Sequence, residues 1–253
     1  MQQVTLASVR VNDTDLHGAL DWVEQHLRDG RPGYACFCEA SLLSNVPCNA
    51  EVAQALERAD AVFADGIALM MLARLAGHPL PGRVPGPSFL PAACECGLAR
   101  GWRHFFYGGA PGVAERLAER LRERYAGLCV VGAYSPPFRA LTDAEEVEVK
   151  RRIEASGAHL LWVCLGSPKQ ELWVAEHLGK INVPLMLPVG AAFDFHSGNR
   201  PWAPVWLRKL GLEWAYRTCT GGRRTFARNL RCVTVVAGIL AKAALRRVMR
   251  KPV

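Results

Sequence analysis

The sequence lacks a secretion signal and a long uncharged apolar segment. Residues 1–15 contain no basic stretch followed by an apolar run, so the chain is expected to stay in a reducing cytoplasm. Residues 232–241 form an uncharged run of only ten residues, which Lys242 ends. A membrane-spanning helix needs about 20 apolar residues. This run therefore does not predict a helix that crosses a bilayer.

Several ligand-binding motifs are also missing. The nine cysteines do not show the paired C-x-x-C spacing of a zinc site. The G-x-G-x-x-G and G-x-x-x-x-G-K-[ST] motifs are absent, so NAD and ATP are not the expected ligands. We expect no D-x-D motif between an apolar strand and its loop, which favours chemistry without a metal ion.

Positive charge is concentrated near the carboxyl end. From Arg200 onward the chain has 13 Lys or Arg and a single acid, Glu213, for a net charge of +12. The residues before Arg200 carry a net charge of −4. Such a basic segment favours polyanionic partners: nucleic acid, diphosphates or an anionic membrane surface.

Before Arg200, short apolar runs alternate with amphipathic segments. This alternation is typical of an α/β fold with a Rossmann-like parallel sheet flanked by helices. We predict strands at 34–38, 61–64, 104–107, 129–133, 160–165 and 185–189, and helices at 50–58, 111–125, 143–156 and 168–178. In such sheets ligands bind at the carboxyl ends of the strands.

Four predicted strand ends carry polar or glycine-rich residues. Asp65-Gly66 follows one strand, and the glycine-rich turns 108–113 and 166–171 follow two others. Glycine allows close backbone approach, and helix N-termini bind phosphate, so these turns favour a nucleotide or sugar-nucleotide site. Asp194 follows the fourth strand, either as a cap for the next segment or as a ligand for a ribose or base.

The motifs occur in a recognisable order. They are Asp65-Gly66-Ile67, Arg83-Val84-x-Gly86, Gly108-Gly109-x-Pro111-Gly112-Val113-Ala114-Glu115, Gly166-Ser167-Pro168-Lys169-Gln170-Glu171, Gly190-Ala191-Ala192-Phe193-Asp194-Phe195, Gly198, Ala203-Pro204-x-Trp206 and Gly211-Leu212-Glu213-Trp214-x-Tyr216-Arg217. This order, from about Tyr34 to Arg231, resembles that of the WecG/TagA/CpsF family of bacterial glycosyltransferases. The resemblance implies a Rossmann-like core at 1–199 and a basic helical appendage at 200–253.

The resemblance also implies an activity. Members transfer a sugar from a nucleotide diphosphate donor, here expected to be a UDP-sugar, to a polyprenyl-diphosphate-linked acceptor during cell-surface polysaccharide synthesis. The reaction inverts the anomeric centre and uses neither metal nor cofactor. The protein would act at the cytoplasmic face of the cell membrane, as a peripheral protein on an anionic surface. The oligomeric state is left open.

Individual roles follow by matching positions. Asp65 is expected to be the catalytic base, although an Asp in this place could instead cap the helix that begins near Ile67. Arg83 and Gln170 would contact the reacting groups. The residues expected to bind the donor are Gly66, Gly108, Gly109, Pro111, Gly112, Gly166, Pro168 and Asp194. Those expected to meet the acceptor or its diphosphate are Cys36, Cys38, Arg217, Arg224, Arg228 and Arg231.

The chain departs from the family pattern around the expected acceptor pocket. Cys36 and Cys38 replace the Thr and Asn of a T-x-N-A-E motif, Ser88 replaces an acid, and Trp202 replaces an Arg. In a strand, C-x-C also places both thiols on one face, as expected of small buried residues. An inactive nucleotide-sugar-binding or scaffold relative is therefore an alternative. A nucleic-acid-binding role is disfavoured, because Phe226 is the only aromatic residue beyond Tyr216.

The basic segment has its own pattern. Arg224, Arg228, Arg231, Lys242 and Arg246 fall on one helical stripe, with apolar residues elsewhere on the wheel. This pattern is typical of a helix that lies in a membrane interface. The alternative is a helix that packs on its own domain or on a partner subunit.

Overall fold

The computed structural model describes residues 1–220 and 222–249, without the side chains of residues 222–225, 227, 228 and 246. Its centre is a six-stranded parallel sheet in the order β4-β3-β8-β7-β5-β6. The strands are β3 (Gly33–Cys38), β4 (Ala61–Ala64), β5 (Arg103–Gly108), β6 (Cys129–Tyr134), β7 (Leu160–Cys164) and β8 (Leu185–Pro188). Every residue of β3, β4 and β8 is buried, as expected of parallel strands covered on both faces. The predicted α/β fold is confirmed, and all six predicted strands are present.

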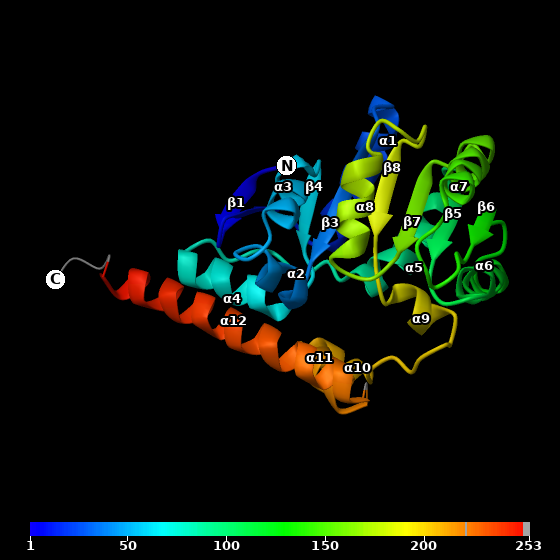
Figure 1. The fold of residues 1–253 in the computed structure, drawn as a ribbon. Coiled ribbons are helices and arrows are strands. Elements are labelled where there is room, and N and C mark those ends of the chain that lie inside the picture. Colours follow the sequence, from blue (N-terminus) through cyan, green and yellow to red (C-terminus); the bar gives the residue numbers. More distant parts are fainter. Residues whose placement is uncertain (221, 250–253) are drawn as a thin grey trace.

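Helices cover both faces of the sheet (Figure 1). One apolar core includes side chains of α1 (Leu16–Asp29), α5 (Gly86–Leu98), α6 (Val113–Arg124) and α9 (Ala192–His196). The other includes side chains of α2 (Ala40–Asn45), α3 (Ala50–Arg58), α4 (Ile67–Ala76), α7 (Asp143–Ala155), α8 (Lys169–His177) and α12 (Gly222–Met249). The sheet is therefore buried between two helical layers.

The amino-terminal region contains elements that the sequence did not predict. β1 (Gln3–Leu6) and β2 (Val9–Asn12) form an antiparallel hairpin. A D-x-D sequence, Asp13-Thr14-Asp15, therefore does follow a strand, although not one of those we predicted. The Asp15 carboxylate accepts a 3.0 Å hydrogen bond from the Gly18 N–H and caps α1. The D-x-D sequence thus caps α1 and precedes all of the family motifs in the chain.

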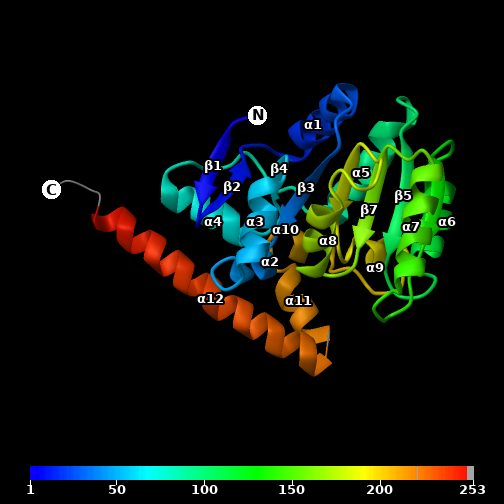
Figure 2. The ribbon, with the colours of Figure 1, turned by 45° about the horizontal axis from the view of Figure 1, so that its top comes forward.

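The carboxyl-terminal segment contains α10 (Val205–Lys209), α11 (Glu213–Thr220) and α12. Both views show α12 running beside α4 and α2 (Figures 1 and 2), and Val236 of α12 is 7% exposed. Three further α12 side chains, Ile239, Leu240 and Ala243, pack against the same core. The face of α12 that contains Val236 therefore packs on its own domain, which was the alternative to a helix lying in a membrane interface.

Candidate active site

The candidate site lies at the carboxyl ends of β4, β3, β8 and β7. The strands point toward α9, α10 and α11 (Figure 1), so the segment after α9 returns to this edge. Asp65 follows β4, Glu39 follows β3, Gly190 follows β8, and Gln170 lies in the first turn of the helix after β7. The motifs singled out in the sequence thus gather at one edge of the sheet.

Asp65 is fixed by its backbone and by one carboxylate oxygen. Its N–H donates to the Cys38 carbonyl oxygen at 3.1 Å, and its Oδ2 accepts a 3.1 Å hydrogen bond from the Gly86 N–H. Burial, followed by the charge of Glu39, raises the pKa of Asp65 to about 8. The N-cap of α4 is Gly66, with no side-chain hydrogen bond, so the capping alternative for Asp65 is wrong.

Arginines and carboxylates from distant segments meet around Asp65. Arg217 of α11 pairs with Glu39, with 3.8 Å between Nη1 and Oε2. The Arg83 Nη2 donates to the Arg208 carbonyl oxygen of α10 at 2.6 Å. Burial raises the pKa of Glu213. Arg83 and Arg217 thus both lie near the Asp65–Glu39 pair, and their expected roles stay predictions.

An aromatic side chain stands at the edge of this cluster. The Arg208 guanidinium lies 3.6 Å from the centroid of the Trp202 ring, a cation–π geometry. Trp202, the residue that replaces the family's Arg, also stacks on Phe195 with centroids 5.7 Å apart. The departure at Trp202 therefore replaces a cation with a ring that holds the neighbouring cation Arg208.

Gln170 and Glu171 are both buried, with exposed fractions of 4% and 1%. The Gln170 Nε2 donates to the Glu171 Oε1 at 2.8 Å. A side chain at Gly190 would place its Cβ 3.4 Å from the same Nε2, and Gly190 has a φ of +53°. The Gln170 amide therefore lies directly against the backbone at the end of β8.

The glycines at the end of β5 allow close packing between strands. A Cβ on Gly108 would lie 2.2 Å from the Cys164 carbonyl oxygen, and Gly108 has a φ of +115°. The Gly109 N–H donates to that same oxygen at 2.7 Å. Pro111 is exposed and precedes the helix, which begins at Val113 after a Gly112 N-cap. The prediction that Pro111 belongs to the first helical turn is wrong.

The N-terminus of α6 already holds a carboxylate of the protein. The Ala114 N–H donates to the Ser135 Oγ at 3.0 Å, and the Ser135 Oγ donates to the Glu115 Oε2 at 2.8 Å. The Glu115 Oε1 accepts from the Ser135 N–H at 3.0 Å. An anion at this helix end would meet that negative charge. The role of the 108–113 turn toward a donor phosphate stays a prediction.

Asp194 lies within α9, whose N-cap is Ala191. Its Oδ1 accepts a 2.6 Å hydrogen bond from the Asn199 Nδ2, and its Oδ2 lies 3.6 Å from the Arg200 Nε. Its charge contributes, after burial, to the raised pKa of Cys164 at the end of β7. The capping alternative for Asp194 is therefore wrong, and its role toward a ribose or base stays a prediction. Gly166, with a φ of +79°, and Pro168 form the turn between β7 and α8.

The remaining acceptor residues divide into three cases. Cys36 and Cys38 are both 0% exposed and belong to the core. The prediction that their side chains contact an acceptor is therefore wrong for this structure. Arg231 is exposed on α12. The side chains of Arg224 and Arg228 lie outside the described residues.

Sequence reasoning missed Glu39, Glu171, Arg208 and Glu213. One signal was available for Glu213, because it is the only acid after Arg200. Glu171 stood inside a quoted motif but had been given no role. Nothing in the local sequence around Arg208 distinguishes it from the other bases of the appendage.

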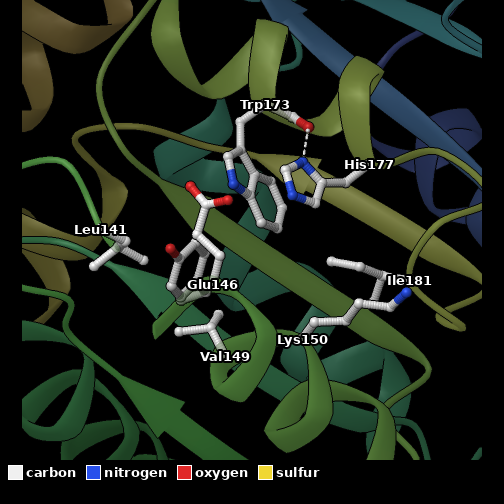
Figure 3. Close-up of a pocket in the computed structure, with 8 residues that line it drawn as sticks. Leu141, Glu146, Val149, Lys150, Trp173, His177 and Ile181 are labelled. Atoms are coloured by element: carbon white, nitrogen blue, oxygen red, sulfur yellow. Dashed lines mark hydrogen bonds between the residues drawn. The ribbon is translucent and has the colours of Figure 1, made fainter. Parts of the chain in front are cut away.

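A separate depression lies on the face covered by α7 and α8 (Figure 3). Tyr107, Glu146, Trp173 and His177 are among its lining residues, and its volume is about 20 Å³. The Trp173 and His177 rings stack with centroids 4.0 Å apart. This space accommodates about one water molecule. The depression is therefore too small to be the substrate site.

Two searches of residues 1–220 and 222–249 bear on metals and membranes. Within those residues, no group of three or more His, Cys, Asp or Glu side chains is arranged to hold a metal ion. Over the same part of the chain, no helix has the length and hydropathy needed to cross a bilayer.

The fold and the site define an α/β protein with a cluster of carboxylates and arginines at the carboxyl edge of a parallel sheet. The chain belongs to the glycosyl transferase WecG/TagA/CpsF family, whose match covers residues 4–250. The resemblance noted in the sequence is thereby confirmed.

Three relatives with similar sequences share the same enzyme name. The chain is similar to N-acetylglucosaminyldiphosphoundecaprenol N-acetyl-beta-D-mannosaminyltransferases of Bacillus spizizenii, at 31% identity over 169 residues, and of Bacillus subtilis, at 25% over 227 residues. The first alignment covers 67% of this chain and 64% of the relative, and the second covers 86% and 83%. A relative from Staphylococcus aureus is 26% identical over 67% of this chain and 65% of its own length.

Proposed function

We propose that this protein transfers a sugar from a UDP-sugar to a polyprenyl-diphosphate-linked acceptor, with inversion and without a metal ion. The observation that carries the proposal is Asp65, a desolvated carboxyl at a strand end, with Arg83 near it and Arg217 paired with its neighbour Glu39. The names of the relatives indicate the first substrates to test: an N-acetylmannosamine donor and N-acetylglucosaminyl-diphosphoundecaprenol.

The reaction is a single displacement. The acceptor hydroxyl oxygen bonds to the anomeric carbon while the bond from that carbon to the donor diphosphate breaks on the opposite face. Asp65 takes the hydroxyl proton, and the departing UDP keeps the electron pair of the broken bond. A positioned base of this kind contributes roughly 10²–10⁴-fold to rate. Its raised pKa of about 8 matches this task near neutral pH.

The charge that grows on the departing diphosphate needs compensation. Arg83, Arg208 and Arg217 lie around the site and are permanently charged. Guanidinium groups bind diphosphate oxygens in bidentate geometry, which is one way to offset the charge without a metal ion. Activity measured after EDTA treatment tests this part. We expect an unchanged rate, whereas a strict requirement for Mg²⁺ or Mn²⁺ would contradict it.

A membrane surface next to the site would supply the lipid-linked acceptor. α10, α11 and the segment between them carry exposed apolar side chains. Gly211 lies close to Ile67 of α4, since an added Cβ on Gly211 would be 3.0 Å from the Ile67 side chain. Ile67 is two residues after Asp65, so this apolar surface reaches the candidate site. Arg231 and Lys242 of α12 are exposed and could meet anionic head groups. We define the apolar rim as the exposed residues Ile67, Met71, Val205, Trp206, Leu210, Leu212 and Trp214.

Transfer assays with labelled UDP-sugars and a synthetic polyprenyl-diphosphate N-acetylglucosamine test the proposal directly. Formation of a lipid-linked disaccharide, with the anomeric configuration opposite to that of the donor, is the expected result. The alternative is an inactive nucleotide-sugar-binding relative, which would bind UDP and give no product. The domain division into 1–199 and 200–253 is part of the proposal, with the second part supplying Arg208, Glu213 and Arg217.

A further inference from the structure

Glu171 is a buried carboxyl group that the proposed mechanism does not use. It is 1% exposed, and no Lys, Arg or His pairs with it among the described residues. Burying an ionised carboxylate without a cation is costly. The groups that face it are the Cys36 and Cys38 thiols of β3, Glu39, and Ser167 and Gln170 of its own turn. None of these supplies a positive charge.

The hydrogen bonds of this pair are incomplete in a specific way. The Gln170 Nε2 donates to the Glu171 Oε1 at 2.8 Å. The Ser167 hydroxyl lies beside the Glu171 carboxyl and is buried without another partner. The two oxygens left over, the Gln170 Oε1 and the Glu171 Oε2, are also buried and unpaired in the described part of the chain. Both can only accept when the carboxyl is ionised. A single proton on the Glu171 Oε2 would convert it into a donor and could satisfy both atoms.

We propose that Glu171 is a positioning residue, whose protonated carboxyl group pairs with the side-chain amide of Gln170 and fixes which edge of that amide faces the substrate. The pair leaves the second N–H of the Gln170 Nε2 as the free donor. That donor would bind an oxygen atom of the nucleotide-sugar, so this inference rests on the proposed function.

The surroundings agree with a neutral pair. Burial raises the pKa of Glu171 to about 7, against the lowering effect of the Gln170 hydrogen bond. The amide lies beside Gly190, where an added Cβ would come within 3.4 Å of the Gln170 Nε2. An amide and a carboxylic acid joined in this manner carry no net charge, which suits the apolar core that contains Cys36 and Cys38.

Infrared spectroscopy of the free protein tests the protonation without any substrate. The test uses an Asp65→Asn background, because Asp65 is a second buried acid, with a pKa raised to about 8. In that background the protein should show the C=O band of a buried carboxylic acid, which is lost as pH rises through about 7. The band should be absent in Glu171→Gln and present in Glu176→Gln, which alters an exposed acid on the same helix. A band that persists unchanged in Glu171→Gln would overturn the proposal.

Kinetics test the positioning. Glu171→Gln keeps a neutral hydrogen-bonding group and should retain a kcat close to that of wild type. Glu171→Met removes it and should lower kcat about 10- to 100-fold, with less effect on the KM of the donor. In a Gln170→Ala background, Glu171→Met should cause no further loss of kcat. Melting temperatures of all variants serve as the folding control.

Two outcomes count against the positioning role. One is that Glu171→Met lowers kcat by the same factor in the wild-type and in the Gln170→Ala background. The other is a Glu171→Gln variant as slow as Glu171→Met. If wild type transfers no sugar at all, the proposed function fails, while the infrared result still decides whether Glu171 holds a proton.

Discussion

The Asp65 carboxylate accepts a 3.1 Å hydrogen bond from the Gly86 N–H, and this contact joins the end of β4 to the first residue of α5. The bond occupies Oδ2, so Oδ1 is the oxygen left to receive a proton from an acceptor hydroxyl. One carboxylate therefore holds the loop in place and offers a base to the substrate.

Asp65→Asn should lower kcat at least about 100-fold and leave UDP binding nearly unchanged, because an amide can keep the Gly86 hydrogen bond but cannot act as a base. In Glu171→Gln, where the group at position 171 stays neutral at every pH, kcat/KM should rise as pH increases through about 8, since only the ionised Asp65 carboxyl accepts a proton. Steady-state kinetics and calorimetric UDP titration measure both. A variant that keeps more than about a tenth of wild-type turnover would remove Asp65 from the role of base.

His104 should make the fold sensitive to acid. It is buried, its Nδ1 accepts from the Trp162 Nε1 at 3.0 Å, and burial lowers its pKa to about 4. The unfolded chain binds a proton near pH 6.5, so it holds more protons than the folded state between about pH 4 and 6.5. The free energy of unfolding should therefore fall as pH is lowered through this window, by at most about 3.4 kcal/mol.

Urea denaturation of wild type and His104→Gln, at several pH values in that window, measures this effect. Glutamine can accept the Trp162 hydrogen bond but does not titrate. The pH dependence should flatten in His104→Gln and stay unchanged in His17→Gln, which alters an exposed histidine. Identical slopes in all three proteins would show that His104 is not the titrating group.

The apolar rim should bind anionic vesicles. Trp206 and Trp214 are 61% and 44% exposed, and aromatic side chains favour the membrane interface. Replacing both with Glu should reduce co-sedimentation with anionic vesicles, because it removes apolar contact and adds charge of the wrong sign. Binding by wild type should weaken with added salt. Phe138→Glu, at a 90% exposed position after β6, is the matched control and should sediment like wild type.

Val236 should stabilise the fold from within the basic segment. Val236→Ala removes two buried methyl groups, and a loss of about 1.5–2 kcal/mol in the free energy of unfolding is expected. Val233→Ala makes the same change at a 40% exposed position of the same helix and should cost much less. Equal effects would mean that α12 does not pack on α4 in solution. Deletion of α12 is consequently a poor test of membrane binding, because it also removes part of the core.

Sequence patterns predicted the parallel sheet because its strands are continuous apolar runs with few alternatives. The amino-terminal hairpin was missed, since each strand has four residues and its exposed positions interrupt the apolar pattern. α5 was missed because it contains Gly86, Pro87 and Pro91, which usually end helices. Asp65 and Gln170 could be placed from strand ends. The pairing of Glu39 with Arg217 joins segments distant in sequence, and no local pattern encodes it.

The place of β3 in the sheet has a consequence for biosynthesis. β3 pairs with β8 through Gly33 and Leu185, so the centre of the sheet cannot close until most of the chain has left the ribosome. At usual translation speeds the delay between the two strands is on the order of 10–30 s. During that interval the nascent chain presents an unpaired apolar strand edge, the kind of surface that aggregates. Folding of this protein is therefore tied to the completion of its synthesis.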